Sequence, residues 1–235
     1  MSFSFEMFLE CLKAGAHYIP VTVEITLISY IASIVLGMLI AILRSYRVPV
    51  ISQILAAIIT VYRGVPVTVA LVVYNLLFMT YYAKVTGFLG IKIPLSEVNL
   101  VIIGYFGMIL TYSCYISEGF RGAFLSVDKL QFEAGYSVGL TKTQTFFRII
   151  LPQMIPAAAP ILVNMLIGCV KSTNLVSVLG VTEVMGGSIL PGALSYRFLE
   201  GYLAAAVIYW LIGSILEFIA RRIETYSGRY RRQAI

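Results

Sequence analysis

The apolar residues of this chain come in long blocks, and this pattern limits what the chain can fold into. A block of about 18 or more apolar residues is long enough to cross a bilayer as one α-helix. Only 12% of the residues are charged, whereas an ordinary soluble domain has about 25%. We therefore expect an all-α integral membrane protein, with residues 1–235 forming one transmembrane domain. Its five spans are predicted at about residues 19–43, 65–82, 98–120, 155–179 and 202–219.

The second apolar block, from about residue 50 to 82, is too long for one straight span. Arg63, Gly64, Val65 and Pro66 interrupt it, and proline removes a backbone donor and kinks a helix. We expect a lead-in helix at the membrane interface, a break at this motif, and then the second span. A segment rich in glycine and proline, residues 180–201, is expected to connect the fourth and fifth spans.

The basic residues predict which way the chain faces, because segments on the cytoplasmic side carry an excess of lysine and arginine. An outside N-terminus and a cytoplasmic C-terminus put four basic residues outside: Lys13, Lys84, Lys92 and Arg197. The cytoplasmic side then has twelve: Arg44, Arg47, Arg63, Arg121, Lys129, Lys142, Arg148, Arg221, Arg222, Arg229, Arg231 and Arg232. The net charge of +6 therefore belongs mostly to these flanks, and it does not require a nucleic-acid partner.

The polar stretch between spans three and four predicts a cytoplasmic hairpin of two short helices, residues 126–152. Ser126 can cap the first helix, with Asp128 in its first turn, and Gly139 ends it. A capping-box pattern that starts at Thr141 begins the second helix.

Pro152 is expected to break the second helix of the hairpin. The first helix carries an apolar face, formed by Val127, Leu130, Ala134 and Val138 at helical spacing. A small amphipathic helix of this kind suits a groove on a partner protein.

The hairpin resembles the "EAA" coupling loop of the permease subunits of ABC importers, in which a coupling helix docks into a separate ATPase. The family's Glu-Ala-Ala corresponds to Glu133, Ala134 and Gly135, so the third position departs from it. The resemblance implies that these residues couple to the ATPase: Gln131, Glu133, Ala134, Gly135, Gly139, Leu151 and Pro152.

Three further motifs resemble the polar amino-acid uptake branch of that family, whose members carry glutamine, glutamate, arginine, histidine or cystine. They are the Arg-Gly-x-Pro motif at residues 63–66, Glu118 with Arg121 and Gly122, and the segment from Asn164 through Lys171 to Glu183. One departure is Ser172, where that branch often has aspartate after the lysine.

A charge inside a span is costly and usually faces a cavity or a partner. Lys171 is the clearest case, and it suggests a polar path for the solute. The alternatives are that Lys171 snorkels or pairs with Glu183, that Arg63 only anchors a span, and that Glu118 forms a local ion pair with Arg121. The candidate path residues are Lys171, Ser172, Thr173, Asn174, Arg63, Pro66, Thr68, Tyr74, Asn75 and Glu118.

The motifs of catalysis and of nucleotide binding are absent. There is no GxxxxGK[ST] phosphate loop, no GxSxG and no HExxH, and the single histidine and three cysteines show no metal-ligand spacing. We therefore expect a transport subunit and not an enzyme, with no metal and no cofactor of its own.

The resemblance implies a set of partners in a bacterial plasma (inner) membrane. They are a cytoplasmic ATPase dimer that holds ATP and magnesium, an extracellular or periplasmic solute-binding protein, and a second permease chain, identical or different, within the lipid bilayer.

The uncharged residues 172–174 favour a zwitterionic solute, with cystine or a neutral polar amino acid as the expectation. Two alternatives remain at this point. One is an ABC permease for another solute, such as methionine, a metal or a phosphonate. The other is a secondary transporter driven by an ion gradient, a class that often shows paired repeats. No second copy of the hairpin or of the Arg-Gly-x-Pro motif is present.

Overall fold

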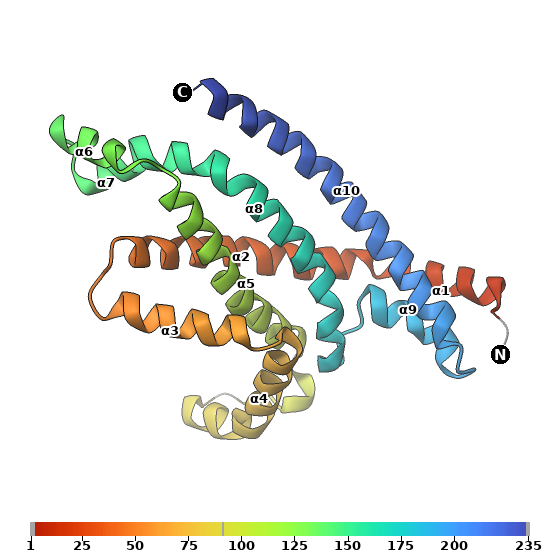
Figure 1. The fold of residues 1–235 in the computed structure, drawn as a ribbon. Coiled ribbons are helices and arrows are strands. Elements are labelled where there is room, and N and C mark those ends of the chain that lie inside the picture. The colour runs from red at the N-terminus through yellow and green to blue at the C-terminus, as the bar shows by residue number, and fades with distance from the viewer. Residues whose placement is uncertain (1–2, 91, 234–235) are drawn as a thin grey trace. The chain divides into compact units, whose positions relative to one another are not determined.

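The computed structural model describes residues 3–90 and 92–233, with side chains up to residue 222. Over these residues the chain forms helices and no strands (Figure 1). The α-helices are α1 (Phe5–His17), α2 (Ile19–Ser45), α3 (Ile51–Gly64), α4 (Val67–Leu89), α5 (Val101–Leu125), α6 (Lys129–Ser137), α7 (Lys142–Thr145), α8 (Leu151–Ser172), α9 (Val184–Ala193) and α10 (Phe198–Gln233). Shorter 3₁₀ helices are η1 (Leu95–Glu97) and η3 (Thr173–Leu179), and η2 (Phe146–Ile150) is a π-helical turn.

The prediction of an all-α fold with five spans is confirmed. Five described segments are long and apolar enough to cross a bilayer: Ile19–Ser45, Val67–Leu89, Val101–Leu125, Lys142–Leu179 and Phe198–Arg222. Most of them extend beyond the predicted limits. Hydropathy shows where a block of apolar residues ends, whereas the helical backbone continues past that point. In α10, for example, Glu217 and Arg221 form an ion pair at 2.9 Å that supports the helix beyond residue 219.

Two compact units make up the chain. One consists of Met1–Ile31, Gly64–Thr111 and Gly168–Gly213, and the other of Ala32–Arg63, Tyr112–Ile167 and Ser214–Ile235. The expectation of a single domain over residues 1–235 stays a prediction. Three of the basic residues predicted on the cytoplasmic side have side chains outside the described residues: Arg229, Arg231 and Arg232.

In the first unit, α1 packs against α9, and neither helix was expected from the sequence. The segment 180–201 connects the fourth and fifth spans as predicted, and it also contains α9 and the start of α10. Glu183 begins α9: its Oε1 accepts from the backbone amides of Met185 at 2.8 Å and Gly186 at 3.3 Å. This side-chain cap supplies the acceptors that the first turn of a helix needs.

In the second unit, α3 confirms the predicted helix before the Arg-Gly-x-Pro break. This helix ends at Gly64, and Pro66 then takes the N-cap position of α4 with an extended backbone (φ −57°, ψ 136°). Proline fits there because it has no amide hydrogen to contribute and resists helical geometry in the residue before it.

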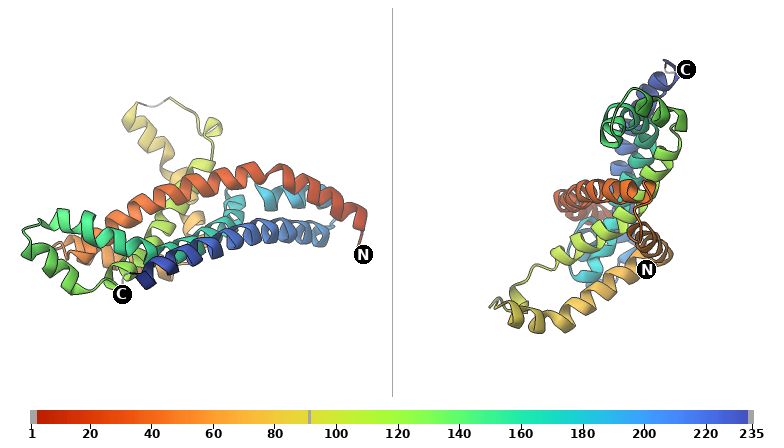
Figure 2. Two further views of the ribbon diagram at one scale, coloured as in Figure 1. Left: turned by 90° about the horizontal axis from the view of Figure 1, so that it is seen from above. Right: turned by 90° about the vertical axis from the view of Figure 1, so that its left-hand side faces the viewer.

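The helical hairpin between α5 and α8 is also present, and α6 and α7 lie side by side (Figure 1 and Figure 2). Two details of the prediction are wrong. Asp128, and not Ser126, is the N-cap of α6, because its carboxylate accepts from the amide of Leu130 at 2.9 Å. Pro152 does not break a helix either, because the helix continues from the π-helical turn Phe146–Ile150 through Pro152 into α8.

Gly187 tests the packing of α1 and α9. A β-carbon on Gly187 would lie 2.2 Å from the ring of Tyr18, whereas one on Gly186 would come no closer than 3.4 Å to Thr182. We expect Gly187→Ala to lower the free energy of unfolding by about 1–3 kcal/mol through overpacking. Gly186→Ala is the matched control and should change it little. Thermal unfolding of the purified protein in detergent measures both, and equal effects would contradict this account of the packing.

Candidate functional site

The turn of the helical hairpin depends on one glycine. Gly139 has a φ of +80°, which favours glycine because it carries no β-carbon. The amides of Gly139 and Leu140 donate to the carbonyls of Tyr136 at 3.0 Å and Gly135 at 3.1 Å, which closes the end of α6.

The second helix of the hairpin starts with the predicted capping box, which is confirmed. The Thr141 hydroxyl accepts from the amide of Gln144 at 3.3 Å, and the Gln144 side chain accepts from the amide of Thr141 at 2.9 Å. This reciprocal pair satisfies two of the amides that a helix start leaves unpaired.

A close approach between α6 and α7 explains the glycine at the third position of the Glu-Ala-Gly run. Gly135 is buried, and a β-carbon there would lie 2.6 Å from Cγ2 of Thr145 and 3.2 Å from Cδ1 of Ile149. Thr145 is itself fully buried, so it cannot move aside. Alanine would suit the helix better, but only glycine leaves room for this contact.

The inner side of the hairpin packs through aromatic rings. Phe124 of α5 lies 5.4 Å from Phe132 of α6 and 6.4 Å from Phe146, measured between ring centroids. Tyr46, just after α2, lies 6.0 Å from Phe124 and 6.3 Å from Phe146. Burial raises the pKa of Tyr46 above its ordinary value, so its phenol stays neutral. This cluster fixes the hairpin to the ends of α2 and α5.

The outer side of the hairpin is uncovered. Glu133 and Ala134 are exposed, and so are Leu130 (64%) and Val138 (74%), which belong to the apolar face that the sequence predicts. Val127 of that face is buried instead. Large apolar side chains exposed beside a carboxylate are typical of a surface that another protein covers.

The remaining predicted coupling residues lie around this hairpin. The Gln153 side chain, at the start of α8, donates to the side chain of Gln131 at 3.3 Å, which joins the two ends of the hairpin. Leu151 and Pro152 form the first turn of α8, and Pro152 is exposed. Four of the seven predicted coupling residues thus lie on α6, Gly139 lies in the turn after it, and two lie at the start of α8. Their coupling role stays a prediction.

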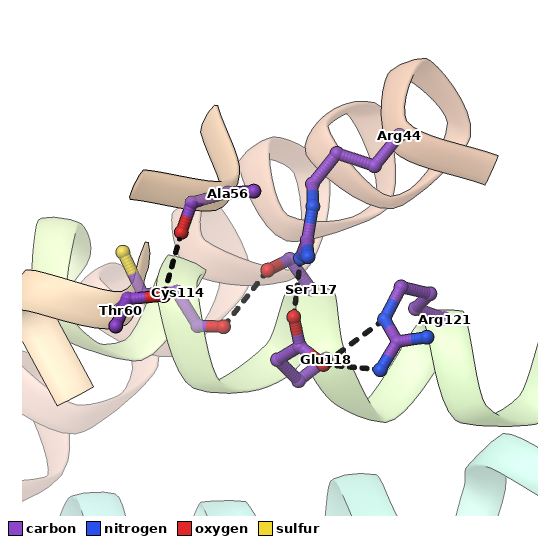
Figure 3. A network of polar contacts seen from close by, with 7 residues as sticks. All are labelled: Arg44, Ala56, Thr60, Cys114, Ser117, Glu118 and Arg121. Atoms are coloured by element: carbon purple, nitrogen blue, oxygen red, sulfur yellow. Dashed lines mark hydrogen bonds and ion pairs between the residues drawn. The ribbon is translucent and has the colours of Figure 1, made fainter. Parts of the chain in front are cut away.

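An ion-pair cluster joins α2 and α5 in the same unit (Figure 3). Glu118 accepts from Arg121 at 2.8 Å and from Arg44, which pairs with its other carboxylate oxygen. The predicted local pair of Glu118 with Arg121 is therefore confirmed. Arg44 was not predicted as a partner of Glu118, because the two residues are 74 positions apart in the sequence.

A second polar cluster surrounds Glu183 in the first unit. This carboxylate is fully buried and accepts from the hydroxyls of Thr22, at 3.2 Å, and of Tyr209. Thr173 lies next to it, with its hydroxyl 3.4 Å from that of Tyr209. Glu183 also caps α9, so donors from α2, α9 and α10 converge on it, and no cation is among them.

This cluster bears on the interpretation of Lys171. Within this chain Glu183 accepts from hydroxyls and amides and not from Lys171, so a pair between the two residues across a subunit boundary stays a prediction. Lys171 lies at the end of α8, is exposed, and makes no ion pair with any described residue. Of its neighbours, Thr173 is buried, whereas Ser172 and Asn174 are partly exposed.

Three predicted path residues lie on α4. This helix packs against η3, the 3₁₀ helix that follows Lys171 in the sequence. Tyr74 meets Phe106 edge to face at 5.7 Å. The side-chain oxygen of Asn75 is buried and has no partner among the described residues. Thr68, which precedes Asn75 on the same helix, is partly exposed. The structure thus brings Thr68, Tyr74 and Asn75 into the same unit as residues 171–174.

The remaining predicted path residues divide between the two units. Pro66, the N-cap of α4, belongs to the first unit, whereas Arg63 and Glu118 belong to the second unit. Arg63 is exposed at the end of α3, and Glu118 is held between two arginines. A role for these residues in the solute path stays a prediction.

These features define a class of protein: an integral membrane protein of five spans, with a helical hairpin that leaves a face open for a partner. Comparison with known proteins names the family. The chain belongs to the family described as "Binding-protein-dependent transport system inner membrane component", which matches residues 33–225. Members of this family are transport subunits, so the chain is a permease component and not an enzyme.

Curated relatives match nearly the whole chain. The probable amino-acid ABC transporter permease protein PatM of Vibrio harveyi is 34% identical over 216 residues, 92% of each chain. The L-cystine transport system permease protein TcyL of Bacillus subtilis is 31% identical over 95% of this chain and 91% of its own. The arginine ABC transporter permease protein ArtQ of Escherichia coli is 30% identical over 90% of this chain and 94% of its own.

Two solved structures share the fold. The crystal structure of an amino acid ABC transporter with histidines has a TM-score of 0.81 at 23% identity, covering 96% of this chain and all of that chain. The inward-facing MetNI methionine ABC transporter has a TM-score of 0.63 at 16% identity, covering 94% of this chain and 99% of that chain. Membership in a binding-protein-dependent family removes the ion-gradient-driven carrier from the alternatives.

Gly135 provides a test of the hairpin. Helix propensity alone would make Gly135→Ala stabilising by about 1 kcal/mol, but the overlap with Thr145 should make it destabilising by about 1–3 kcal/mol. The double variant with Thr145→Ala should recover most of that loss, because both overlapping atoms are removed and the Thr145 hydroxyl has no described partner. A double-mutant cycle of unfolding free energies measures the coupling. A stabilised single variant would contradict the close approach.

Tyr209 provides a test of the Glu183 cluster. Tyr209→Phe leaves a buried carboxylate with one donor fewer, so we expect a loss of about 1–3 kcal/mol in unfolding free energy. The matched control is Tyr105→Phe, because Tyr105 donates to Glu24 at 2.8 Å in an exposed position. That change should cost no more than about 0.5 kcal/mol. Equal losses in the two variants would show that burial of Glu183 does not set the cost.

Proposed function

We propose that this chain is the permease subunit of an ATP-driven importer for a polar amino acid, with cystine or another neutral polar amino acid as the solute. The relatives PatM, TcyL and ArtQ are all named as permeases for amino acids, and they align over most of the chain. No cationic or anionic side chain is present at residues 172–174, which supports a zwitterionic solute over a strongly basic one.

The observation that carries this proposal is the uncovered outer side of the helical hairpin. Leu130, Ala134 and Val138 expose an apolar strip next to Glu133, while aromatic rings hold the inner side in place. A rigid hairpin with an open apolar strip is suited to enter a groove on another protein. The partner we assign to it is the ATPase that binds ATP and magnesium, since this chain has no phosphate loop of its own.

The rest of the assembly follows from that role. Two permease chains, identical or different, would surround one path, with an ATPase on each hairpin and a solute-binding protein on the opposite face. The excess of basic residues supports an N-terminus outside and a cytoplasmic C-terminus, which puts the hairpin on the ATPase side.

The solute path we propose runs along the polar residues of the first unit. Lys171 is an exposed cation at the end of α8 and is available to a carboxylate, and the unpaired oxygen of Asn75 is available to an ammonium group. ATP binding would move the hairpins and shift the population between inward-open and outward-open states. Such a shift requires that ATP and solute bind the two states with different affinity.

Gly139→Pro tests the coupling role. Proline cannot adopt the φ of +80° at this turn and cannot donate the hydrogen bond to Tyr136, so the hairpin should lose its shape. We expect uptake to fall at least about tenfold. ATP hydrolysis by the assembled transporter should continue, with or without its response to the binding protein.

The matched control for that variant is Gly90→Pro. Gly90 also has a left-handed backbone (φ +67°) and ends α4, so the local strain is similar, but it lies outside the hairpin. Uptake per folded transporter should be retained in the control. Normal uptake by the Gly139 variant would refute docking through the hairpin.

A further inference from the structure

A cavity at the corner between α2 and α3 gathers three arginines. It has a volume of about 400 Å³, and Arg44, Arg47 and Arg121 line it together with Ser52 and Gln53. All of these residues belong to the second compact unit. Cavities of this size hold small ligands or ligand head groups.

The positive charge of this arginine pocket is only partly neutralised. Glu118 pairs with Arg44 and Arg121, and none of the described residues that line the pocket is acidic. The charge of one carboxylate therefore offsets only part of the charge of three guanidinium groups. Glu118 also holds Arg44 and Arg121 in fixed positions, which leaves Arg47 exposed and without an ion pair among the described residues.

The backbone of the corner is strained in a way that shapes the pocket. Arg47 has a φ of +51° and Val50 a φ of +63°, although neither is glycine, and a β-branched residue rarely adopts this conformation. Local hydrogen bonds hold the corner: the Arg47 amide donates to Arg44 and the Val48 amide donates to Leu43, both at 3.1 Å. Strained backbone persists only where the surroundings enforce it, and it is concentrated at functional sites.

The chemistry of the pocket suits a phosphate group. A guanidinium presents paired donors that match phosphate oxygens, and Ser52 and Gln53 add neutral donors at the same cavity. Next to the pocket, α3 exposes a stripe of Ile51, Ile54, Ile58 and Val61 at helical spacing. A helix with such a stripe beside basic residues is typical of segments that lie at a membrane surface and attract anionic lipids.

We propose that the arginine pocket binds the phosphate of an anionic phospholipid, with Arg47 as the contacting residue and Glu118 as the residue that positions Arg44 and Arg121. The acyl chains of the lipid lie along the apolar stripe of α3. The bound lipid fixes the corner between α2 and α3.

The test uses the transporter complex purified in detergent, with phosphatidylglycerol of short acyl chains as the probe. Phosphatidylcholine of the same chain length and inorganic phosphate are the comparison ligands, and isothermal titration measures the Kd of each. We expect phosphatidylglycerol to bind most tightly, with an affinity that falls at high salt. Arg47→Gln should weaken its binding about tenfold, because one charge-assisted contact is lost.

Two further variants keep the result interpretable. Gln53→Glu adds a carboxylate at the pocket without changing the ion-pair cluster and should also weaken binding. Arg222→Gln removes an exposed arginine of α10 that contacts Phe218 and does not line the pocket, so it should leave binding unchanged. Each variant is first checked for an unchanged Tm.

The proposal is overturned if phosphatidylglycerol binds equally well to the original protein and to the Arg47 and Gln53 variants. It is also overturned if inorganic phosphate binds as tightly as the lipid, which would assign the pocket to a free anion. A third outcome is that the lipid binds without the ATPase but not in its presence. That result would assign the pocket to an acidic segment of the partner and would equally overturn the proposal.

Discussion

The chain is built for a solvent that offers no hydrogen bonds, so each polar group within a span needs a partner from the protein itself. Two glutamates show how this constraint is met. Glu183 is fully buried and receives hydroxyls and amides from three helices, while Glu118 is held by the guanidinium groups of Arg44 and Arg121. Each carboxylate joins elements that are far apart in the sequence.

Small residues allow the helices to approach closely where hydrophobic burial gives no advantage over lipid. A β-carbon on Gly37 would lie 2.8 Å from Ile116, and one on Gly107 would lie 2.4 Å from Leu71. The same device appears in the hairpin, where Gly135 admits Thr145. Glycine at the third coupling position is therefore a packing choice within this hairpin, and its outer face remains open for a partner.

The features that could be predicted from sequence are those that depend on residues close together in the chain. The apolar blocks marked five spans, the Arg-Gly-x-Pro motif marked the break before α4, and Thr141 marked the capping box. The helices α1 and α9 were missed, because one is short and mixed in polarity and the other is rich in glycine and proline. The partners of Glu183 and the role of Arg44 could not be predicted, because they depend on contacts between distant helices.

We propose that this permease imports a polar amino acid with energy from a separate ATPase. The most direct measurement is uptake of labelled amino acids into liposomes that contain the chain with its ATPase, with and without ATP and with and without the solute-binding protein. We expect uptake of one polar amino acid that requires both ATP and the binding protein. Uptake that persists without ATP and collapses with an ion gradient would contradict it, and so would ATP hydrolysis that moves no amino acid.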